Sequence, residues 1–371
     1  MSTTDLADLA LTVTNDLPIR HQGEVHNGKV RSVYWLTSAD SRRLVEREGY
    51  PVHHDAQLGV MITSDRISAF DVVWQAAEGL MGVPGKGAAL NASSNYWFKR
   101  LQEAGIANHH LVDTPHPQVW LVQKAEPIKI EAVGREYLDG SIWRVYEKGT
   151  REFCGIKLPD GLKRYHRLEQ LIITPTTKGT LQIPGIPQEE DAKITREQIE
   201  ENFRAFGFQS VEDVALYETL SAKAFDLIST ELKKRGYLFL DTKFEFGYVK
   251  RLNGDLEIRF IDEAGTPDSS RIVDKGYYEL GQIAGYSKEP FRQFLLDTFG
   301  RKSEDVLLND ARMEERRELA LTYRVPPDEF RQVAEIYKAI AEAITGEDML
   351  SPDSPREKIM EVLSARYGII Q

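Results

Sequence analysis

The segment Asp241–Gly247, with the sequence DTKFEFG, constrains the fold and chemistry of this chain more than any other. In a β-strand alternate residues share a face, so Asp241, Lys243 and Glu245 lie on one side. The residues between them, two of which are phenylalanines, lie on the other side and can pack into a core. Core packing alone would not select two acids and a lysine for one face. The segment therefore predicts a rigid strand that presents a charged site.

A hairpin turn is predicted directly after this strand. Asn253-Gly254 is the strongest short hairpin signal, and as a two-residue turn it would place Glu245 opposite Asp262. Like charges in that position, at a Cβ separation of about 5 Å, destabilise a sheet. Mg²⁺ would offset this cost, because it binds one or two carboxylates together with phosphate oxygens, whereas Zn²⁺ prefers His or Cys. The alternative is an exposed acidic hairpin in which water solvates both carboxylates. The hairpin sequence alone does not decide between this alternative and a Mg²⁺ site.

The segment after the hairpin favours the site over the solvated hairpin. Residues 263–271, EAGTPDSSR, form a turn rich in short hydroxyl side chains that ends on Arg271. Hydroxyl groups beside a guanidinium fork suit a phosphate or a carboxylate. Candidate metal ligands and a candidate anion clamp therefore lie within one short stretch.

A second candidate phosphate contact lies near the start of the chain. In Asn27–Arg31, NGKVR, glycine lets the backbone approach a phosphate, and Lys29 and Arg31 alternate onto one face of the following strand. Residues 82–87, GVPGKG, lack the Ser or Thr of a Walker loop. No GxGxxG follows a predicted strand, so a Rossmann dehydrogenase is disfavoured as well.

Composition excludes several classes of protein. The 47 Lys and Arg against 58 Asp and Glu give a net charge of −11, which disfavours unspecific nucleic-acid binding. The single cysteine, Cys154, excludes an intramolecular disulfide and a cysteine metal cluster, so we expect it to be structural. No apolar run reaches the roughly 18 residues that span a bilayer, and the acidic first residues do not predict a secretory signal. We therefore expect a cytoplasmic protein.

The apolar patterns predict a mixture of strands and helices. Thr37–Leu58 is polar and is predicted to be a loop or hairpin insertion, and both His53-His54 and His109-His110 are expected to be structural. Strands are predicted at residues 29–36, 59–63, 119–130, 133–138, 238–249 and 256–261, and helices at 90–104, 195–206, 211–235, 327–346 and 355–367.

Eight segments, in order along the chain, resemble the SAICAR synthetase family, whose members are phosphoribosylaminoimidazole-succinocarboxamide synthases. They are GKVRSVY (28–34), TSDRISAFDVV (63–73), VPGKGAALNASSNYWF (83–98), GREYLDGSIWRVY (134–146), CGIKLPDGL (154–162), TPTTKG (174–179), DTKFEFG (241–247) and IDEAGTPDSSR (261–271).

The resemblance implies an α+β fold with two lobes, antiparallel sheets and a nucleotide cleft between the lobes, similar to ATP-grasp and protein-kinase architecture. On that basis we expect an N-terminal lobe at 1–125, a C-terminal lobe at 126–300 and a helical extension at 301–371. The implied reaction joins L-aspartate to the carboxylate of CAIR, a carboxylated aminoimidazole ribotide. ATP is cleaved to ADP and phosphate, and the product is SAICAR.

The resemblance also implies roles for individual residues. The residues that match those of the ATP phosphate turn and the DxKxE strand are Gly28, Lys29, Val30, Arg31, Asp241 and Lys243. Glu245 and Asp262 match the Mg²⁺ site. The residues that match the CAIR site are Arg135, Ser141, Ser270, Arg271 and Arg292. Lys178 matches a basic residue of the same cleft, and Asp71 an acid near the imidazole and aspartate pockets. Lys243, Asp71 and Lys178 are the expected catalytic residues.

Two other classes of protein fit less well. A kinase would share the phosphate turn and the acids but would lack the two anion clamps, and it would not need aspartate. A non-catalytic nucleotide-binding module would have lost Lys243, Glu245 or Asp262, and all three are present. The expected partners are the small molecules CAIR, L-aspartate and ATP, with neither nucleic acid nor membrane. The sequence leaves open whether the chain is a monomer or a homo-oligomer.

Overall fold

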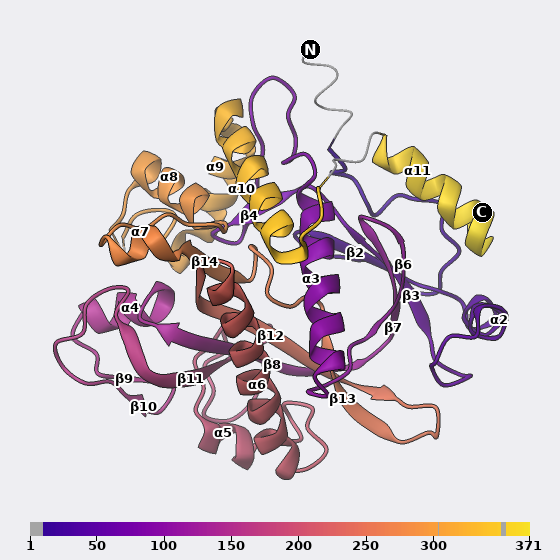
Figure 1. Ribbon diagram of the computed structural model, residues 1–371, viewed down its shortest axis with the longest axis horizontal. Helices are drawn as coiled ribbons and strands as arrows, with labels where there is room; N and C mark the ends of the chain where they lie inside the picture. The colour runs from indigo at the N-terminus through magenta and orange to yellow at the C-terminus, as the bar shows by residue number, and fades with distance from the viewer. Residues whose placement is uncertain (1–9, 303, 350–353) are drawn as a thin grey trace. The chain divides into compact units, whose positions relative to one another are not determined.

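A computed structural model of the chain describes residues 10–302, 304–349 and 354–371 (Figure 1). The chain divides into two compact units that interleave along the sequence. The first unit contains residues 1–93, 111–124 and 285–371, and the second contains 94–110 and 125–284. The expected division at residues 125 and 300 into three consecutive domains stays a prediction. Within the described ranges, no helix combines the length and apolar character needed to cross a bilayer.

The first unit contains a five-stranded antiparallel sheet in the order β1-β2-β3-β7-β6. Tyr34, Val60 and Leu121 from this sheet are almost completely buried in one hydrophobic cluster. The strands are β1 (His26–Asn27), β2 (Arg31–Trp35), β3 (Leu58–Thr63), β6 (Leu111–His116) and β7 (Val119–Gln123).

The C-terminal helices complete the two hydrophobic clusters of the first unit. Phe291, Phe330 and Tyr337 belong to the cluster that contains the hairpin β4 (Ile67–Ala69) and β5 (Val72–Trp74). Leu363 and Tyr367 belong to the cluster of the five-stranded sheet. The elements are α8 (Glu289–Phe299), η1 (Asp310–Arg312), α9 (Met313–Thr322), α10 (Pro327–Thr345), α11 (Pro355–Val362) and the π-helical turn η2 (Leu363–Tyr367).

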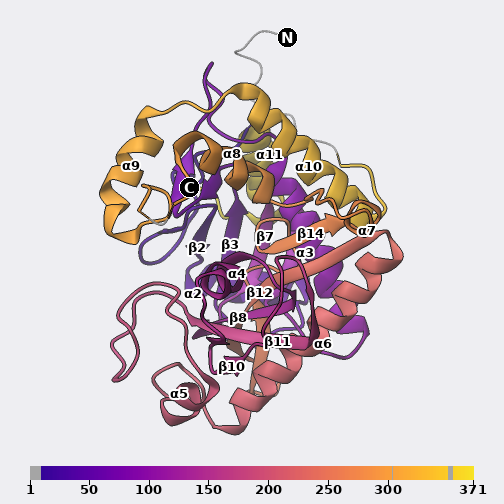
Figure 2. The ribbon, with the colours of Figure 1, turned by 90° about the vertical axis from the view of Figure 1, so that its left-hand side faces the viewer.

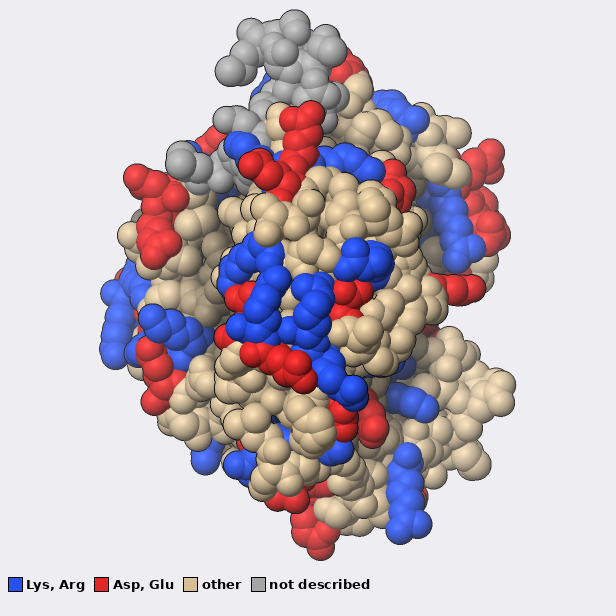
Figure 3. Space-filling view, turned by 90° about the vertical axis from the view of Figure 1, so that its right-hand side faces the viewer, with Lys and Arg blue, Asp and Glu red and all other residues tan. Residues whose placement is uncertain are grey.

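Within the first unit, arginines from its N-terminal part bind the C-terminal residues of the chain. Arg43 donates to the carbonyl of Tyr367 at 2.9 Å, and Arg20 donates to that of Ile370 at 3.0 Å. Cations at the C-terminal end of a helix satisfy its free carbonyls and its dipole. Figure 3 views the side on which α2 and α11 lie in Figure 1, where Lys and Arg gather among Asp and Glu. Because they bind backbone carbonyls, Arg20 and Arg43 have a structural function.

The prediction of a loop or hairpin at Thr37–Leu58 was wrong, because α2 (Ser38–Glu48) occupies half of this segment. Thr37 caps the helix by accepting from the Asp40 amide at 3.1 Å, and Gly49 ends it with φ 67°. Only a narrow stripe, including Leu44 and Val45, is buried. The many charged residues concealed this stripe, although both capping signals are present in the sequence.

The second unit contains a five-stranded antiparallel sheet in which the long strand β12 (Tyr237–Lys250) is central. One edge of β12 pairs with β8, and the other edge pairs with β14 and then with β13. The remaining strands of the sheet are β8 (Glu126–Tyr137), β11 (Arg167–Thr177), β13 (Leu256–Ile261) and β14 (Ser270–Asp274), and a separate pair is β9 (Glu152–Phe153) with β10 (Ile156–Lys157).

The long helix α6 (Glu212–Lys234) lies against one face of this sheet (Figures 1 and 2). Phe225 of α6 approaches the strands so closely that a Cβ on Gly134 would lie 2.8 Å from its ring. Phe244 and Phe246 of β12 are buried, and the ring of Phe246 packs at 6.2 Å from that of Tyr217 of α6. The predicted aromatic face of β12 is thus confirmed, and the opposite face contains its charged residues.

Other predicted elements are present with shifted ends. The helix α3 (Lys86–Glu103) starts earlier than predicted, and α5 (Arg196–Glu201) is shorter; the remaining helices of the second unit are α4 (Gly140–Glu147) and α7 (Lys275–Glu279). The predicted break between strands at residues 131–132 was wrong, since β7 ends at Gln123 and β8 runs from Glu126 to Tyr137.

Candidate active site

Two neighbouring strands of the second unit place charged residues on the same face. Asp241 of β12 pairs with Arg135 of β8, and Glu245 pairs with Glu131. Paired residues of an antiparallel sheet point their side chains to the same side. The side of the sheet opposite α6 therefore contains a ladder of charges from both strands.

One end of this ladder consists of ammonium and carboxylate groups. Lys243 Nζ lies 2.6 Å from Glu131 Oε1 and 3.1 Å from Glu245 Oε1, and Lys178 of the loop after β11 binds Glu245 Oε2. Burial would raise the pKa of Glu245, but the charges of Lys243 and Lys178 outweigh it and leave this pKa lowered. Burial raises the pKa of Glu131, and the facing Glu245 adds to the effect despite Lys243. Lys243 thus lies between two carboxyl groups whose pKa values shift in opposite directions, that of Glu245 downward and that of Glu131 upward.

The predicted register of the hairpin was wrong by one residue. Glu245 pairs with Ile261, not with Asp262, because the loop has three residues rather than two. Arg251 accepts from the Gly254 amide at 3.0 Å, and Gly254 has φ 92°, the left-handed conformation that ends a three-residue hairpin loop. The like-charged residue across the ladder from Glu245 is therefore Glu131.

Asp262 follows the end of β13 and has φ 61°, so it does not continue the alternation of the strand. Burial would lower the pKa of Lys243, but the charges of Glu245, Glu131 and Asp262 raise it well above its usual value. Asp262 thus acts on the same ammonium group as the two glutamates, although it lacks the predicted pairing.

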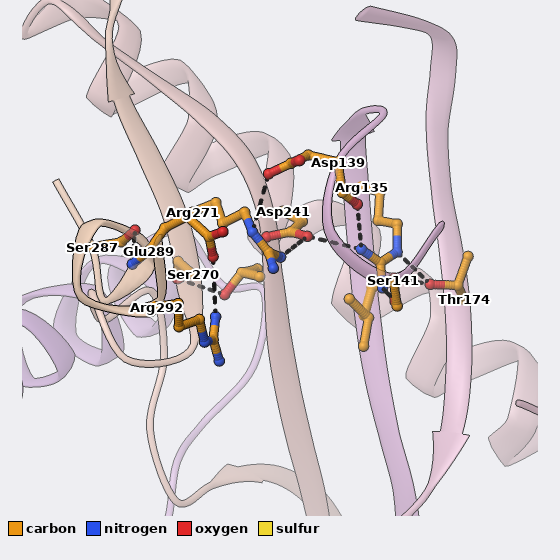
Figure 4. A network of polar contacts seen from close by, with 12 residues as sticks. Arg135, Asp139, Ser141, Thr174, Asp241, Ser270, Arg271, Ser287, Glu289 and Arg292 are labelled. Atoms are coloured by element: carbon orange, nitrogen blue, oxygen red, sulfur yellow. Dashed lines mark hydrogen bonds and ion pairs between the residues drawn. The ribbon is translucent and has the colours of Figure 1, made fainter. Parts of the chain in front are cut away.

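The other end of the ladder is built from guanidinium groups (Figure 4). Asp241 Oδ2 accepts from Arg135 at 2.8 Å and from Arg271 of β14 at 2.7 Å. Arg271 also lies 3.2 Å from Asp139, which Arg164 approaches at 2.7 Å. One buried carboxylate therefore orients two arginines, and a second carboxylate fixes the outer one.

The guanidinium nitrogens of Arg135 donate almost entirely to other residues of the protein. It is 4% exposed and donates to Thr174 at 2.9 Å and to Ser141 at 3.0 Å, in addition to Asp241. Arg271 is more accessible, with 18% of its side chain exposed. Arg271 is thus better placed than Arg135 to contact a ligand.

Two small residues fit closely around Arg271. Gly140 has φ 68°, and a Cβ there would lie 2.6 Å from Arg271 Nη1, so only glycine leaves room for this guanidinium. The adjacent Ser270 is buried, and its hydroxyl lies 2.8 Å from that of Thr242.

The first unit contains the turn at Gly28–Arg31, for which the sequence predicts a phosphate contact. Gly28 and Arg31 close the turn through a backbone hydrogen bond of 2.8 Å, and Arg66 donates to the Gly28 carbonyl at 3.0 Å. Lys29 Nζ binds Asp71 Oδ1 at 2.5 Å, and about half of each side chain is exposed. The side chain of Lys29 is thus at the surface, as a phosphate contact requires.

Asp71 lies in the turn between β4 and β5. Burial would raise the pKa of its carboxyl, but Lys29, Arg316 and Arg292 outweigh it and leave this pKa lowered. Arg292 of α8 also lies 3.5 Å from Glu289 of the same helix, as Figure 4 shows. Three cations of the first unit thus keep Asp71 ionised.

The histidine pair after α2 has a carboxylate beside it. Donor atoms of His53, His54 and Asp55 lie within 4.8 Å of one another, and this is the one such triad found in the described residues. Arg42 binds Asp55 at 3.0 Å, and His53 Nδ1 accepts from the Asp55 amide at 3.1 Å. These contacts suit the structural role that we expect for the pair.

Sequence reasoning missed Glu131 and Asp139. The misplaced strand break put Glu131 in a predicted gap, and a strand running on to Tyr137 would have placed it in the alternation of Arg135. Asp139 precedes Gly140 in the resembling segment 134–146, and this position beside a glycine was the only signal for it in the sequence.

Known proteins resemble this chain over nearly its whole length. The SAICAR synthetase family model matches residues 45–307. The phosphoribosylaminoimidazole-succinocarboxamide synthase of Colwellia psychrerythraea is 53% identical, covering 99% of this chain and 100% of that protein. The same enzyme of Vibrio vulnificus is 53% identical over 98% of this chain and 99% of its own length.

Solved structures share the fold. A SAICAR synthase from Saccharomyces cerevisiae, solved with SAICAR, has a TM-score of 0.65 and 26% identity, covering 91% of this chain and 99% of its own. A SAICAR synthetase solved with ADP has a TM-score of 0.56 and 22% identity, covering 88% and 99%. The predicted mixed fold of helices and antiparallel sheets is thereby confirmed. On this agreement of motifs, fold and relatives, the chain belongs to the SAICAR synthetase family.

Proposed function

We propose that this chain joins L-aspartate to the carboxylate of CAIR at the expense of ATP, giving SAICAR, ADP and phosphate. A carboxylate is a poor electrophile, so ATP first converts it to an acyl phosphate, which the aspartate amine then attacks. All three substrates are anions, and an acidic protein needs a local concentration of cations to bind them. The observation that supports this most is the single sheet face with guanidinium groups at one end and paired ammonium and carboxylate groups at the other.

The ammonium and carboxylate end suits Mg²⁺ and the phosphates of ATP. Glu245 and Asp262 supply the hard carboxylate oxygens that Mg²⁺ prefers, and the acids of this end outnumber Lys178 and Lys243 once Glu131 is included. The bound metal ion would neutralise phosphate charge during transfer. Lys243 and Lys178 would add positive charge from the protein, and Lys178, 38% exposed, can turn from Glu245 to a phosphate.

The guanidinium end suits the ribotide. Arg271 would bind its carboxylate or phosphate, and the hydroxyls of Ser141 and Ser270 would add hydrogen bonds. Arg135, being buried, would hold Asp241 and Ser141 in place. This assigns Arg135 to positioning within the substrate site.

The first unit would contribute the phosphate turn Gly28–Arg31, with Lys29 as the charged contact, and Arg292 as a further cation for an anionic substrate. Asp71 would bind or orient the aspartate amine. Because its pKa is lowered, Asp71 is ionised at neutral pH and is a weak proton acceptor, so an electrostatic role fits it better than general-base catalysis.

Measuring ADP release with CAIR and L-aspartate together, and then with each omitted, tests the proposal. We expect sustained ADP release only with both substrates, in equal amount to SAICAR. With ¹⁸O in the CAIR carboxylate, one labelled oxygen should appear in the released phosphate, because the amine displaces the acyl phosphate. Sustained ADP release without aspartate, or unlabelled phosphate, would contradict the proposal and favour a kinase or ATPase.

A further inference from the structure

The turn that presents Asp71 has an unusual backbone. Ala69 and Val72 pair across the β4–β5 hairpin, which leaves Phe70 and Asp71 as a two-residue turn with φ of 54° and 64°. Such turns favour Asn-Gly, because both positions are left-handed. Aspartate tolerates this conformation, whereas phenylalanine adopts it only where the surroundings hold it. Some contact must therefore stabilise this turn.

Phe70 packs against the hydrophobic cluster of the hairpin, and Arg316 of α9 adds a hydrogen bond to its backbone. Arg316 is 1% exposed and donates to the carbonyl of Phe70 at 3.2 Å. Its other nitrogens donate to the carbonyls of Val306 and Asn309, both at 3.0 Å. One planar guanidinium thus joins the Phe70–Asp71 turn to the segment before α9.

The hydrogen bonds to three carbonyls give Arg316 a structural function, and the surroundings of its charge point to a second one. Its carboxylate partner, Asp310, lies 3.3 Å away with 93% of its side chain exposed, so water screens that charge. A buried charge is costly, and a packed apolar side chain is often at least as stable. The charge of Arg316 instead acts on Asp71, together with Lys29 and Arg292.

We propose that Arg316 is a positioning residue for Asp71: by holding the Phe70 carbonyl, it fixes the left-handed turn that presents the Asp71 carboxylate to the substrates. The C-terminal helical region thereby contributes to the catalytic site without touching a ligand. This inference rests on the proposed function of Asp71.

The test compares Arg316→Met and Arg316→Lys with a control, Arg317→Met, in an exposed residue of the same helix that pairs with Glu314. We expect Arg316→Met to lower kcat/KM by about 10- to 100-fold, because small misplacements of a catalytic group have effects of this size. It should also move the acid limb of the pH profile to higher pH, since the lowered pKa of Asp71 rises once a cation is lost. Arg316→Lys should leave the acid limb of the pH profile in place and should have a higher kcat/KM than Arg316→Met. Arg317→Met should change neither the acid limb nor kcat/KM.

An Asp71→Asn background separates this inference from the proposed function. There Arg316→Lys should cause no further loss of kcat/KM, because the group that it positions is gone. Unchanged kinetics in both Arg316 variants, or an additive loss in that background, would overturn the inference. If circular dichroism shows that Arg316→Met does not fold, the comparison of Arg316→Lys with the Arg316→Lys, Asp71→Asn double mutant tests the inference instead. A fully active Asp71→Asn would instead refute the proposed function of Asp71.

Discussion

Replacing Glu245 with glutamine is expected to lower turnover by at least about 10²- to 10³-fold, the size of effect seen when one preorganised electrostatic group is removed from an active site. Glutamine keeps the shape of the side chain but removes the charge that Lys243 and Lys178 face. It also removes a carboxylate from the proposed Mg²⁺ site. The phosphate charge should therefore be neutralised less effectively, and Lys178 should lose the carboxylate that orients it.

The fold should survive this substitution. Lys243 keeps its contact with Glu131 at 2.6 Å, and the side chain of Lys178 is exposed enough to turn toward the solvent. Glu257→Gln is the matched control, because Glu257 lies on the adjacent β13 and binds Arg259 at 2.8 Å. Steady-state ADP release over a range of Mg²⁺ concentrations, with thermal melting of each variant, provides the measurement. A Glu245→Gln protein with the full rate would refute the metal assignment.

Removing residues 301–371 is expected to abolish folding of the first unit. The deleted segment contributes large side chains that are at most 4% exposed. Burial of one such side chain contributes roughly 1.5–3 kcal/mol, and a whole domain is stable by only about 5–15 kcal/mol. Together the ten side chains would contribute roughly 15–30 kcal/mol, which equals or exceeds that margin. These side chains are Leu307, Val325, Phe330, Val333, Tyr337, Ile340, Ile344, Ile359, Leu363 and Tyr367.

Expression of residues 1–300 and a urea titration followed by circular dichroism test this expectation. Leu321→Ser in the full chain is the control, because Leu321 lies in the same region with 69% exposure and should tolerate a polar replacement. From the sequence alone, the truncated chain was expected to keep its chemistry if the region only packed on the body or dimerised. A truncated chain with a cooperative transition near that of the full chain would contradict the burial described above.

The central strand of the site was predictable because two signals agree in it. Alternation of charged and aromatic residues defines the faces of β12, and α6 covers the aromatic face as core packing requires. The turn at Asn253-Gly254 was also predicted correctly, but not its length. A glycine with positive φ ends both two-residue and three-residue loops, so the sequence could not distinguish the two registers.

The partner of Glu245 could not be predicted for the same reason. Slipping the register by one residue exchanges the residue across the hairpin, and the acid that does face Glu245 comes from β8, far away in the sequence. The burial of Arg135 likewise depends on Thr174, Ser141 and Asp241 from separate segments. Pairings between distant strands are set by tertiary packing, which local patterns do not encode.

Titration of CAIR and of Mg²⁺-ATP into Arg271→Ala tests most directly the claim that one sheet face binds the ribotide at its guanidinium end and the nucleotide at its ammonium end. Loss of hydrogen bonds from a charged group costs about 1.5–3 kcal/mol, so the Kd for CAIR should rise roughly 10- to 100-fold. The Kd for Mg²⁺-ATP should stay unchanged, because Arg135 still holds Asp241. Arg251→Ala, at the exposed tip of the β12–β13 hairpin, should change neither constant. Equal weakening of both ligands by Arg271→Ala, or unchanged binding of CAIR, would contradict the account.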